Sequence, residues 1–250
     1  MGITVLCILM LVPAAYAATI SGAPANGRLD VYFRAAPGEA NELRVLPSES
    51  TVRFAGSAPL VAGDHCMAVG ASSVRCVPPG PSGLAVYTRT GDADDIVFAP
   101  IGGVVLGDVA LGSGDDTGLG TGRMRGGRGS DELRALKSGA RVKGGALFHG
   151  GPGEDVLVGG PRRDLLDGGP GPDLAVGGRR FDELQGGGGP DQLAGGFGRD
   201  AIFAGPGNDL VRAADPLPDI IRCGRGRDIA YVAARDRTTG CERVVLGWPG

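Results

Sequence analysis

Seven aspartates recur at intervals of nine residues and are the side chains of this chain best suited to bind a metal ion. They are Asp155, Asp164, Asp173, Asp182, Asp191, Asp200 and Asp209. A carboxylate supplies a hard anionic oxygen, and glycine, which accepts a positive φ, lets backbone carbonyl oxygens turn toward the same point. Calcium takes six to eight such oxygens in flexible geometry. The spacing therefore predicts a row of calcium sites.

Each of these aspartates holds the sixth place of a nonad, and seven nonads follow one another without interruption from residue 150 to 212. They read GGPGEDVLV, GGPRRDLLD, GGPGPDLAV, GGRRFDELQ, GGGGPDQLA, GGFGRDAIF and AGPGNDLVR. The eighth place is always apolar, which predicts one very short strand after each aspartate with this side chain inward. Aspartate could instead serve only as a turn residue, but turns accept Asn or Ser equally well, and neither occupies the sixth place.

These nonads resemble the RTX, or hemolysin-type, calcium-binding repeat GGxGxDxUx, in which U is a large apolar residue. The resemblance is close over residues 150–212, loose over residues 91–231 and not visible in residues 18–90. It implies an all-β fold, a right-handed parallel β-roll, in which two nonads form one coil and the strands alternate between two sheets. Aspartates eighteen residues apart then stack ~4.8 Å apart along one edge, with a calcium ion between successive coils.

The aspartates divide between two edges under this rule. The first edge carries Asp155, Asp173, Asp191 and Asp209, and the second carries Asp164, Asp182 and Asp200, so the gaps between them predict about five ions. We expect the glycines of the first edge to contribute to the sites, namely Gly151, Gly153, Gly169, Gly171, Gly187, Gly189, Gly205 and Gly207. Because like charges repel at this spacing over a thin core, folding is expected to depend on calcium.

The second edge departs from the family pattern in the fourth place of its nonads. This place holds Arg162 and Arg180 in two copies, and only Gly198 is retained. Arginine resists a positive φ and brings a cation near the metal. We therefore expect the first edge to bind calcium more tightly than the second.

The N-terminus indicates the compartment. Residues 3–15 form an uncharged apolar run that ends in Ala15-Tyr16-Ala17, a small-x-small cleavage pattern. The run is too short to span a membrane, and no later segment is long and apolar enough to do so. We expect residues 1–17 to be a signal peptide and the mature protein to be secreted. No Lys or Arg precedes the run, and the alternative is a buried first strand.

Four cysteines follow the expected signal peptide, and an even number in an exported chain favours disulfides. Three pairings are possible. We expect Cys66–Cys76 and Cys223–Cys241, because each encloses a short loop. Buried free thiols are the alternative, and a zinc site is disfavoured because the CxxC spacing is absent.

Composition agrees with a repeat architecture. The 250 residues include 48 Gly and 18 Pro, and only 5% are aromatic, which disfavours a large close-packed core. The expected organisation is a signal peptide (1–17), a β-rich region (18–90), degenerate repeats (91–149), the calcium-binding roll (150–231) and a C-terminal cap (232–250). Short strands are predicted at 29–33, 43–46, 51–54 and 84–88. Residues 130–136 could form a capped helix, but the preceding glycines favour a further repeat.

Recognisable enzyme chemistry is missing from the sequence. The HExxH and GxSxG motifs are absent, and the carboxylates available for acid–base work are more simply interpreted as charges of solvated turns. These carboxylates are Glu39, Glu42, Asp92, Asp94 and Asp95. The arginines of the array alternate with acids along the chain, so no nucleic-acid partner is expected.

The sequence thus predicts a secreted calcium-binding protein with a structural or adhesive role and no enzyme activity. Its protein or cell-surface partner is not specified by the residues. One alternative is an extracellular hydrolase with its active site in residues 18–145 and the repeats as a calcium-dependent folding aid. A calcium-independent scaffold is the third possibility.

Overall fold

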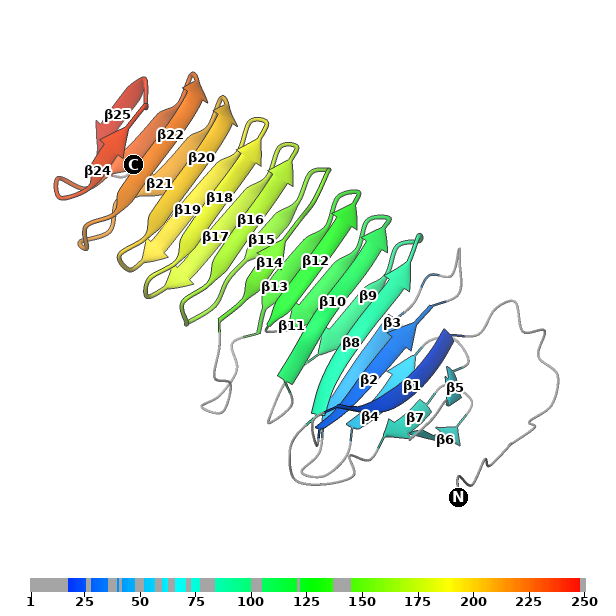
Figure 1. Ribbon diagram of the computed structural model, residues 1–250. Helices are drawn as coiled ribbons and strands as arrows, with labels where there is room; N and C mark the ends of the chain where they lie inside the picture. Colours follow the sequence, from blue (N-terminus) through cyan, green and yellow to red (C-terminus); the bar gives the residue numbers. More distant parts are fainter. Residues whose placement is uncertain are drawn as a thin grey trace.

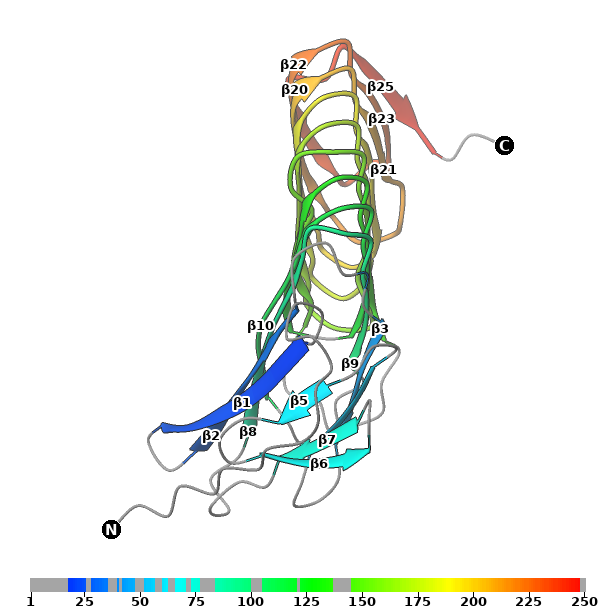
Figure 2. The same cartoon turned by 90° about the vertical axis from the view of Figure 1, so that its right-hand side faces the viewer.

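The computed structural model of the chain describes residues 18–25, 28–35, 40, 42–47, 52–56, 60–62, 66–70, 73–76, 84–99, 105–120, 122–136 and 145–247. The regular elements over these ranges are all β-strands, and they form two sheets that face each other across a row of coils (Figures 1 and 2). Within these ranges, no helix has the length and apolar character needed to cross a membrane. The expected signal peptide lies outside the described residues and stays a prediction.

Sheet A has 12 strands and sheet B has 13. In spatial order, sheet A consists of β24 (Arg237–Thr239), β22 (Ile220–Gly226), β20 (Ala201–Gly207), β18 (Glu183–Gly188), β16 (Leu165–Pro170), β14 (Leu147–His149), β12 (Arg123–Arg128), β10 (Val105–Ser113), β8 (Leu84–Gly91), β2 (Arg28–Arg34), β1 (Ala18–Ala25) and β5 (Leu60–Ala62). In the same sense, sheet B consists of β25 (Arg243–Leu246), β23 (Ile229–Val232), β21 (Leu210–Ala213), β19 (Gln192–Phe197), β17 (Leu174–Arg179), β15 (Val156–Val158), β13 (Glu132–Ala135), β11 (Thr117–Gly120), β9 (Ile96–Ala99), β3 (Glu42–Pro47), β4 (Val52–Gly56), β7 (Ser73–Cys76) and β6 (Cys66–Gly70).

From β8 to β25 the chain winds as a solenoid of about eight turns, and successive strands alternate between the two sheets. Neighbours within a sheet are parallel, and in the regular part they are eighteen residues apart, as when Leu166 pairs with Leu184. These findings confirm the parallel β-roll. Residues 132–135 form strand β13 rather than a helix, so the interpretation of residues 126–131 as a further repeat is confirmed.

The N-terminal strands continue the same two sheets with a different pairing. Strand β2 is parallel to β8 and strand β3 is parallel to β9, whereas the pairs β1–β2, β3–β4, β4–β7 and β6–β7 are antiparallel. The strands predicted at 29–33, 43–46, 51–54 and 84–88 correspond to β2, β3, β4 and β8. The domain boundaries proposed from the sequence stay predictions.

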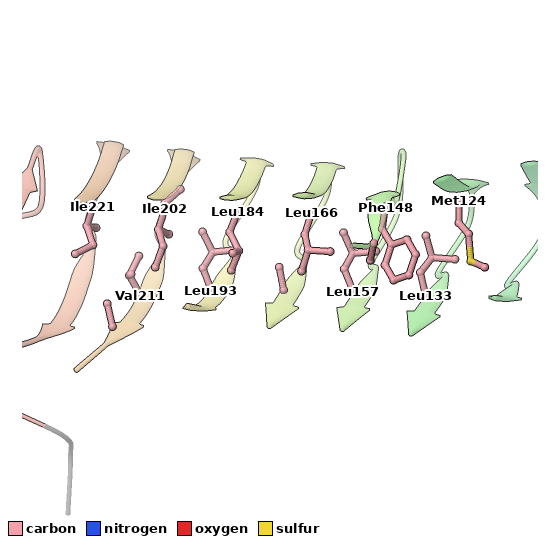
Figure 3. Packing of buried hydrophobic residues seen from close by; sticks show 14 of the residues in the cluster. Met124, Leu133, Phe148, Leu157, Leu166, Leu184, Leu193, Ile202, Val211 and Ile221 are labelled. Carbon is pink, nitrogen blue, oxygen red and sulfur yellow. The ribbon is translucent and has the colours of Figure 1, made fainter. Parts of the chain in front are cut away.

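The core of the roll is a narrow layer between the sheets to which most of the short strands contribute a single large side chain (Figure 3). The eighth-place residues of the seven nonads are all fully buried, which confirms that they point inward. In β15 the flanking residues are half-buried, as expected for a strand with one face on the core. A core this thin leaves much of the stability to the turns at the two edges.

Candidate metal centres

The first edge consists of the turns that lead from sheet A to sheet B, and its aspartates link each coil to the next. Oδ1 of Asp173 accepts a hydrogen bond of 2.9 Å from the backbone N–H of Asp155, one coil earlier. Asp191 and Asp209 repeat this contact at 2.9 Å with the coils before them. The sequence places each aspartate directly before a strand, so its side chain meets the start of the adjacent strand. The expected stack of the four aspartates is thus present.

This ladder of aspartates on the first edge is longer than the regular nonads. The same hydrogen bond joins Asp95 to Asp116 and Asp116 to Asp131, and it then joins Asp131 to Asp155. At the other end Asp209 donates to Asp228, and the Asp228 N–H donates to Glu242 at 2.7 Å. Sequence reasoning did not assign these flanking residues to sites, although the loose resemblance to the repeat over residues 91–231 was the signal that could have identified them.

The second edge consists of the turns from sheet B back to sheet A and carries a shorter ladder. The N–H of Asp164 donates to Asp182 and that of Asp182 to Asp200, both at 2.8 Å. Beyond the nonads the ladder continues through Asp219 and Asp236. It begins at residue 146, an alanine whose N–H donates to Asp164 Oδ1 at 2.5 Å. The two-edge division of the seven aspartates is therefore as expected.

Only one oxygen of each ladder carboxylate is used by this hydrogen bond. The second oxygen, Oδ2, is buried and has no hydrogen-bond partner in Asp116, Asp131, Asp155, Asp173, Asp182, Asp191, Asp200, Asp209, Asp219 and Asp228. Asp164 differs, because its Oδ2 accepts a hydrogen bond from the Gly160 N–H at 2.5 Å. A buried carboxylate oxygen without a partner is costly, so ten such atoms call for a cation or for protons.

In several nonads that begin with glycine, the unpartnered oxygen of the aspartate turns toward that glycine and meets a backbone oxygen there. A Cβ placed on Gly177 would lie 2.7 Å from Asp182 Oδ2 and 2.6 Å from the Gly195 carbonyl oxygen. A Cβ on Gly168 would likewise clash with Asp173 Oδ2 and with the carbonyl oxygen of Gly186. At these two glycines a carboxylate oxygen and a carbonyl oxygen from the next coil thus approach one point, where a Cβ would clash with both; the last nonad has Ala204 in this place.

Burial dominates the electrostatics of the ladders. It raises the pKa of Asp116, Asp173, Asp191 and Asp219 to about 7, against an ordinary value of 3.8. It raises the pKa of Asp131, Asp155 and Asp200 to about 6. The pKa of Asp182 is raised to about 8, chiefly by burial and further by the neighbouring carboxylates of Asp164 and Asp200. Each ladder therefore resists being charged unless positive charge is supplied.

The turn backbones of the two edges differ, and the sequence-based expectation for the two arginines holds for one of them. On the first edge the glycines in the second place all have positive φ, as does the fourth-place glycine of Gly153, Gly171 and Gly189. Gly207 is not in that region, although a Cβ there would clash with the carbonyl oxygen of Gly189. On the second edge Arg180 adopts φ 78°, whereas Arg162 has no positive φ. The predicted strain therefore applies to Arg180 and was wrong for Arg162.

The donor set fits calcium better than a transition metal. Within the described ranges no three His, Cys, Asp or Glu side chains gather in a way that could hold a metal ion. An ion at the ladders would draw its ligands from one or two aspartates and several backbone carbonyls, which are hard oxygens. Calcium accepts such a set, whereas zinc requires nitrogen or sulfur ligands.

Two other predicted features lie near the ends of the chain. A disulfide joins Cys223 to Cys241, as expected, and ties β22 to the segment before β25. Cys66 and Cys76 are paired in register across β6 and β7. Their side chains lie outside the described residues, so this second disulfide stays a prediction.

Two of the carboxylates considered for catalysis take part in contacts between coils, and Glu39 lies outside the described residues. Asp95 is buried in the first-edge ladder, so its interpretation as a charge of a solvated turn was wrong. Asp94 Oδ1 accepts a hydrogen bond from the Asp115 N–H at 2.8 Å. Both therefore serve in the contacts between coils.

Comparison with known proteins gives one finding. Residues 149–179 and 176–211 match the family model of the RTX calcium-binding nonapeptide repeat, with four copies. No curated protein and no solved structure matches the chain. The ladder aspartates of the nonads fall within the matched residues, and the flanking ones fall outside them. Residues 149–211 are thus RTX calcium-binding nonapeptide repeats, and they form the centre of a parallel β-roll.

Proposed function

We propose that the protein is a secreted calcium-binding β-roll with a structural or adhesive role, and that calcium drives its folding. The observation that carries this proposal is the stack of buried carboxylate oxygens without partners along both edges. An isolated buried carboxylate is unstable unless it is protonated or paired with a cation. Calcium, when bound, supplies the positive charge that these oxygens and the nearby carbonyls lack.

The ligands we assign are the seven nonad aspartates and the glycine carbonyls of the turns. Five gaps between successive aspartates, three on the first edge and two on the second, correspond to about five ions. In each gap the chain contributes a carboxylate oxygen already held by a backbone N–H from the neighbouring coil. Binding one ion therefore fixes two coils against each other, which couples calcium affinity to the order of the whole roll.

Export is supported by two features. The apolar run at residues 3–15 with its small-x-small ending is typical of a signal peptide. The disulfide between Cys223 and Cys241 is the kind of bond that persists in oxidising compartments outside the cytoplasm. Calcium is also more abundant there, so sites of modest affinity are occupied.

The decisive experiment compares two charge-neutral variants of the mature chain. Asp191→Asn keeps an acceptor for the Asp173 N–H but removes a buried charge, and Asp167→Asn removes a half-exposed charge on the face of sheet A. Circular dichroism and calorimetric titration should show that calcium induces β-structure in the parent chain and in Asp167→Asn. Asp191→Asn should bind fewer ions and need more calcium to fold.

Two results would count against the proposal. Identical spectra of the parent chain in EDTA and in millimolar calcium would support the calcium-independent scaffold. If the two variants bind the same number of calcium ions and fold at the same calcium concentration, the ladder aspartates are not the calcium ligands. The hydrolase alternative is addressed by a broad hydrolase screen on the intact mature chain.

A further inference from the structure

The second edge gathers exposed arginines that are scattered in the sequence. Three of its turns belong to three consecutive coils (Figure 1). They connect β15 to β16, β17 to β18, and β19 to β20. The third to fifth places of these turns hold Arg162, Arg163, Arg179, Arg180 and Arg199. Four of the five are exposed and Arg162 is half-buried. Coils repeat every ~4.8 Å, so the five guanidinium groups share one short strip of surface.

Large apolar side chains stand on the same strip. Phe197 is 67% exposed and Phe181 is 38% exposed, and Leu217 in the next turn of this edge is 46% exposed. The guanidinium of Arg163 lies 4.7 Å from the centre of the Phe181 ring. We call the five arginines with Phe181, Phe197 and Leu217 the arginine–phenylalanine patch.

The acids that alternate with these arginines in the sequence do not neutralise them at the surface. Asp164, Asp182 and Asp200 are at most 2% exposed and point into the roll. No salt bridge joins any of the five arginines to another residue in the described part of the chain. The patch is therefore cationic, although the whole chain has a formal net charge of -3.

The regular nonads of the first edge have a different surface, and arginines recur in these places of that edge only beyond them, at Arg225 and Arg227. The same places of its turns in the regular nonads carry mainly Pro and Gly, with Glu154 and Asn208 as the polar exceptions. None of the exposed large hydrophobic residues lies in those first-edge turns. The two edges share a backbone plan and a ladder of aspartates, so the patch must serve a purpose other than folding.

We propose that the arginine–phenylalanine patch binds the surface of a membrane that contains anionic phospholipids. Arginine forms paired hydrogen bonds with phosphate, and exposed Phe and Leu at the tips of turns insert among lipid headgroups and upper acyl chains. A soluble polyanion would account for the arginines but not for Leu217. The strip runs along the axis of the roll, so the roll lies flat on the membrane with its second edge down.

The test uses vesicle sedimentation with the full mature chain in calcium. Vesicles of equal parts phosphatidylcholine and phosphatidylglycerol are compared with vesicles of phosphatidylcholine alone. The double variant Arg179→Glu, Arg199→Glu reverses two charges in the third and fifth places of second-edge turns. Its control, Arg225→Glu, Arg227→Glu, reverses two exposed charges in the matching places of a first-edge turn. Circular dichroism in the same buffer checks that both variants fold.

We expect the parent chain to bind the anionic vesicles and to lose binding as salt is raised. The Arg179→Glu, Arg199→Glu variant should partition at least tenfold less, and the control should stay within about twofold of the parent. Equal binding by the two variants overturns the proposal, as does equal binding to both kinds of vesicle. Because this comparison concerns a surface rather than calcium ligands, its failure leaves the calcium proposal intact.

A second measurement reports on the apolar part of the patch. Trp248 is the one tryptophan of the chain, so a Trp248→Phe background allows a reporter at Phe197→Trp. Its emission should shift to the blue with anionic vesicles, since the exposed ring enters the lipid interface. An unshifted emission, or displacement of the protein from vesicles by a single-stranded oligonucleotide at equal charge concentration, would assign the patch to a soluble polyanion and overturn the lipid assignment.

Discussion

Without calcium, the roll should be more stable at pH 5 than at pH 8. Eight ladder aspartates have a pKa raised by burial to values between about 6 and 8. A carboxylate with a raised pKa in the folded state stabilises the fold while it is protonated. That contribution is complete below the unfolded value of 3.8 and is lost as the pH rises through the folded value.

The size of the effect follows from these values. Between pH 5 and pH 8, an aspartate with a pKa of about 6 loses ~1.4 kcal/mol of stability and one at about 7 loses ~2.7 kcal/mol. The eight groups together lose on the order of 20 kcal/mol as an upper bound. Water screens the charges at the edges, so the loss in solution is smaller than this bound. Even ~6 kcal/mol equals the whole stability of many domains.

Urea unfolding in metal-free buffer, followed by circular dichroism, measures this difference directly. We expect a clear transition at pH 5 and a weak or absent one at pH 8. Saturating calcium should restore the transition at pH 8, because the ion takes over the role of the protons. Asp182→Asn should reduce the pH dependence most among single variants, since its pKa of about 8 is the highest of these aspartates. Asp167→Asn serves as the control on the exposed face.

The reasoning would be refuted by urea midpoints that are equal at pH 5 and pH 8 without calcium. A higher midpoint at pH 8 would refute it more strongly, since it would mean that the folded state favours the ionised ladders.

Three further predictions concern single features of the roll in saturating calcium. Arg180→Gly should raise the free energy of unfolding by about 1 kcal/mol, because it relieves a φ of 78°, whereas Arg162→Gly should give no gain; urea midpoints compare the two. Leu184→Ala should cost about 2–5 kcal/mol, because it removes the inward side chain of its strand, and a loss under 1 kcal/mol would show that the core is unimportant. Reduction of the Cys223–Cys241 disulfide should cost about 3 kcal/mol for its 18-residue separation, measured by thermal unfolding with and without reductant.

Local sequence was sufficient to determine the regular coils. Glycine, aspartate and one apolar residue recur every nine positions, so strand, turn and inward direction follow from the chain itself. Leu166 and Leu184 could be assigned to the core because an alternating strand with one buried face has only one register that hides them. The two-edge arrangement followed from the family resemblance, and the structure agrees with it.

The flanking ladder could not be read from spacing, because its coils differ in length. Asp95, Asp116, Asp131 and Asp155 are separated by 21, 15 and 24 residues, yet each donates its N–H to the next aspartate. Loops of different length leave the sheet register unchanged, since hydrogen bonds between coils set that register and chain spacing does not. Spacing could not show either that Arg180 and not Arg162 has a positive φ, because both residues hold the fourth place of a nonad.

The positive charge of the second-edge surface was the feature that could be recognised only from the tertiary structure. Along the sequence Arg163, Arg179 and Arg199 are separated by aspartates, which indicated a mixture of charges with no net field. In the roll each of these aspartates is buried and each of these arginines is exposed. Stacking the coils therefore brings the arginines together at the surface and leaves the aspartates beneath them. The sequence by itself determined which residues each turn contains, and only the winding of the chain decided which turns became neighbours, because adjacency here arises from contacts eighteen residues apart.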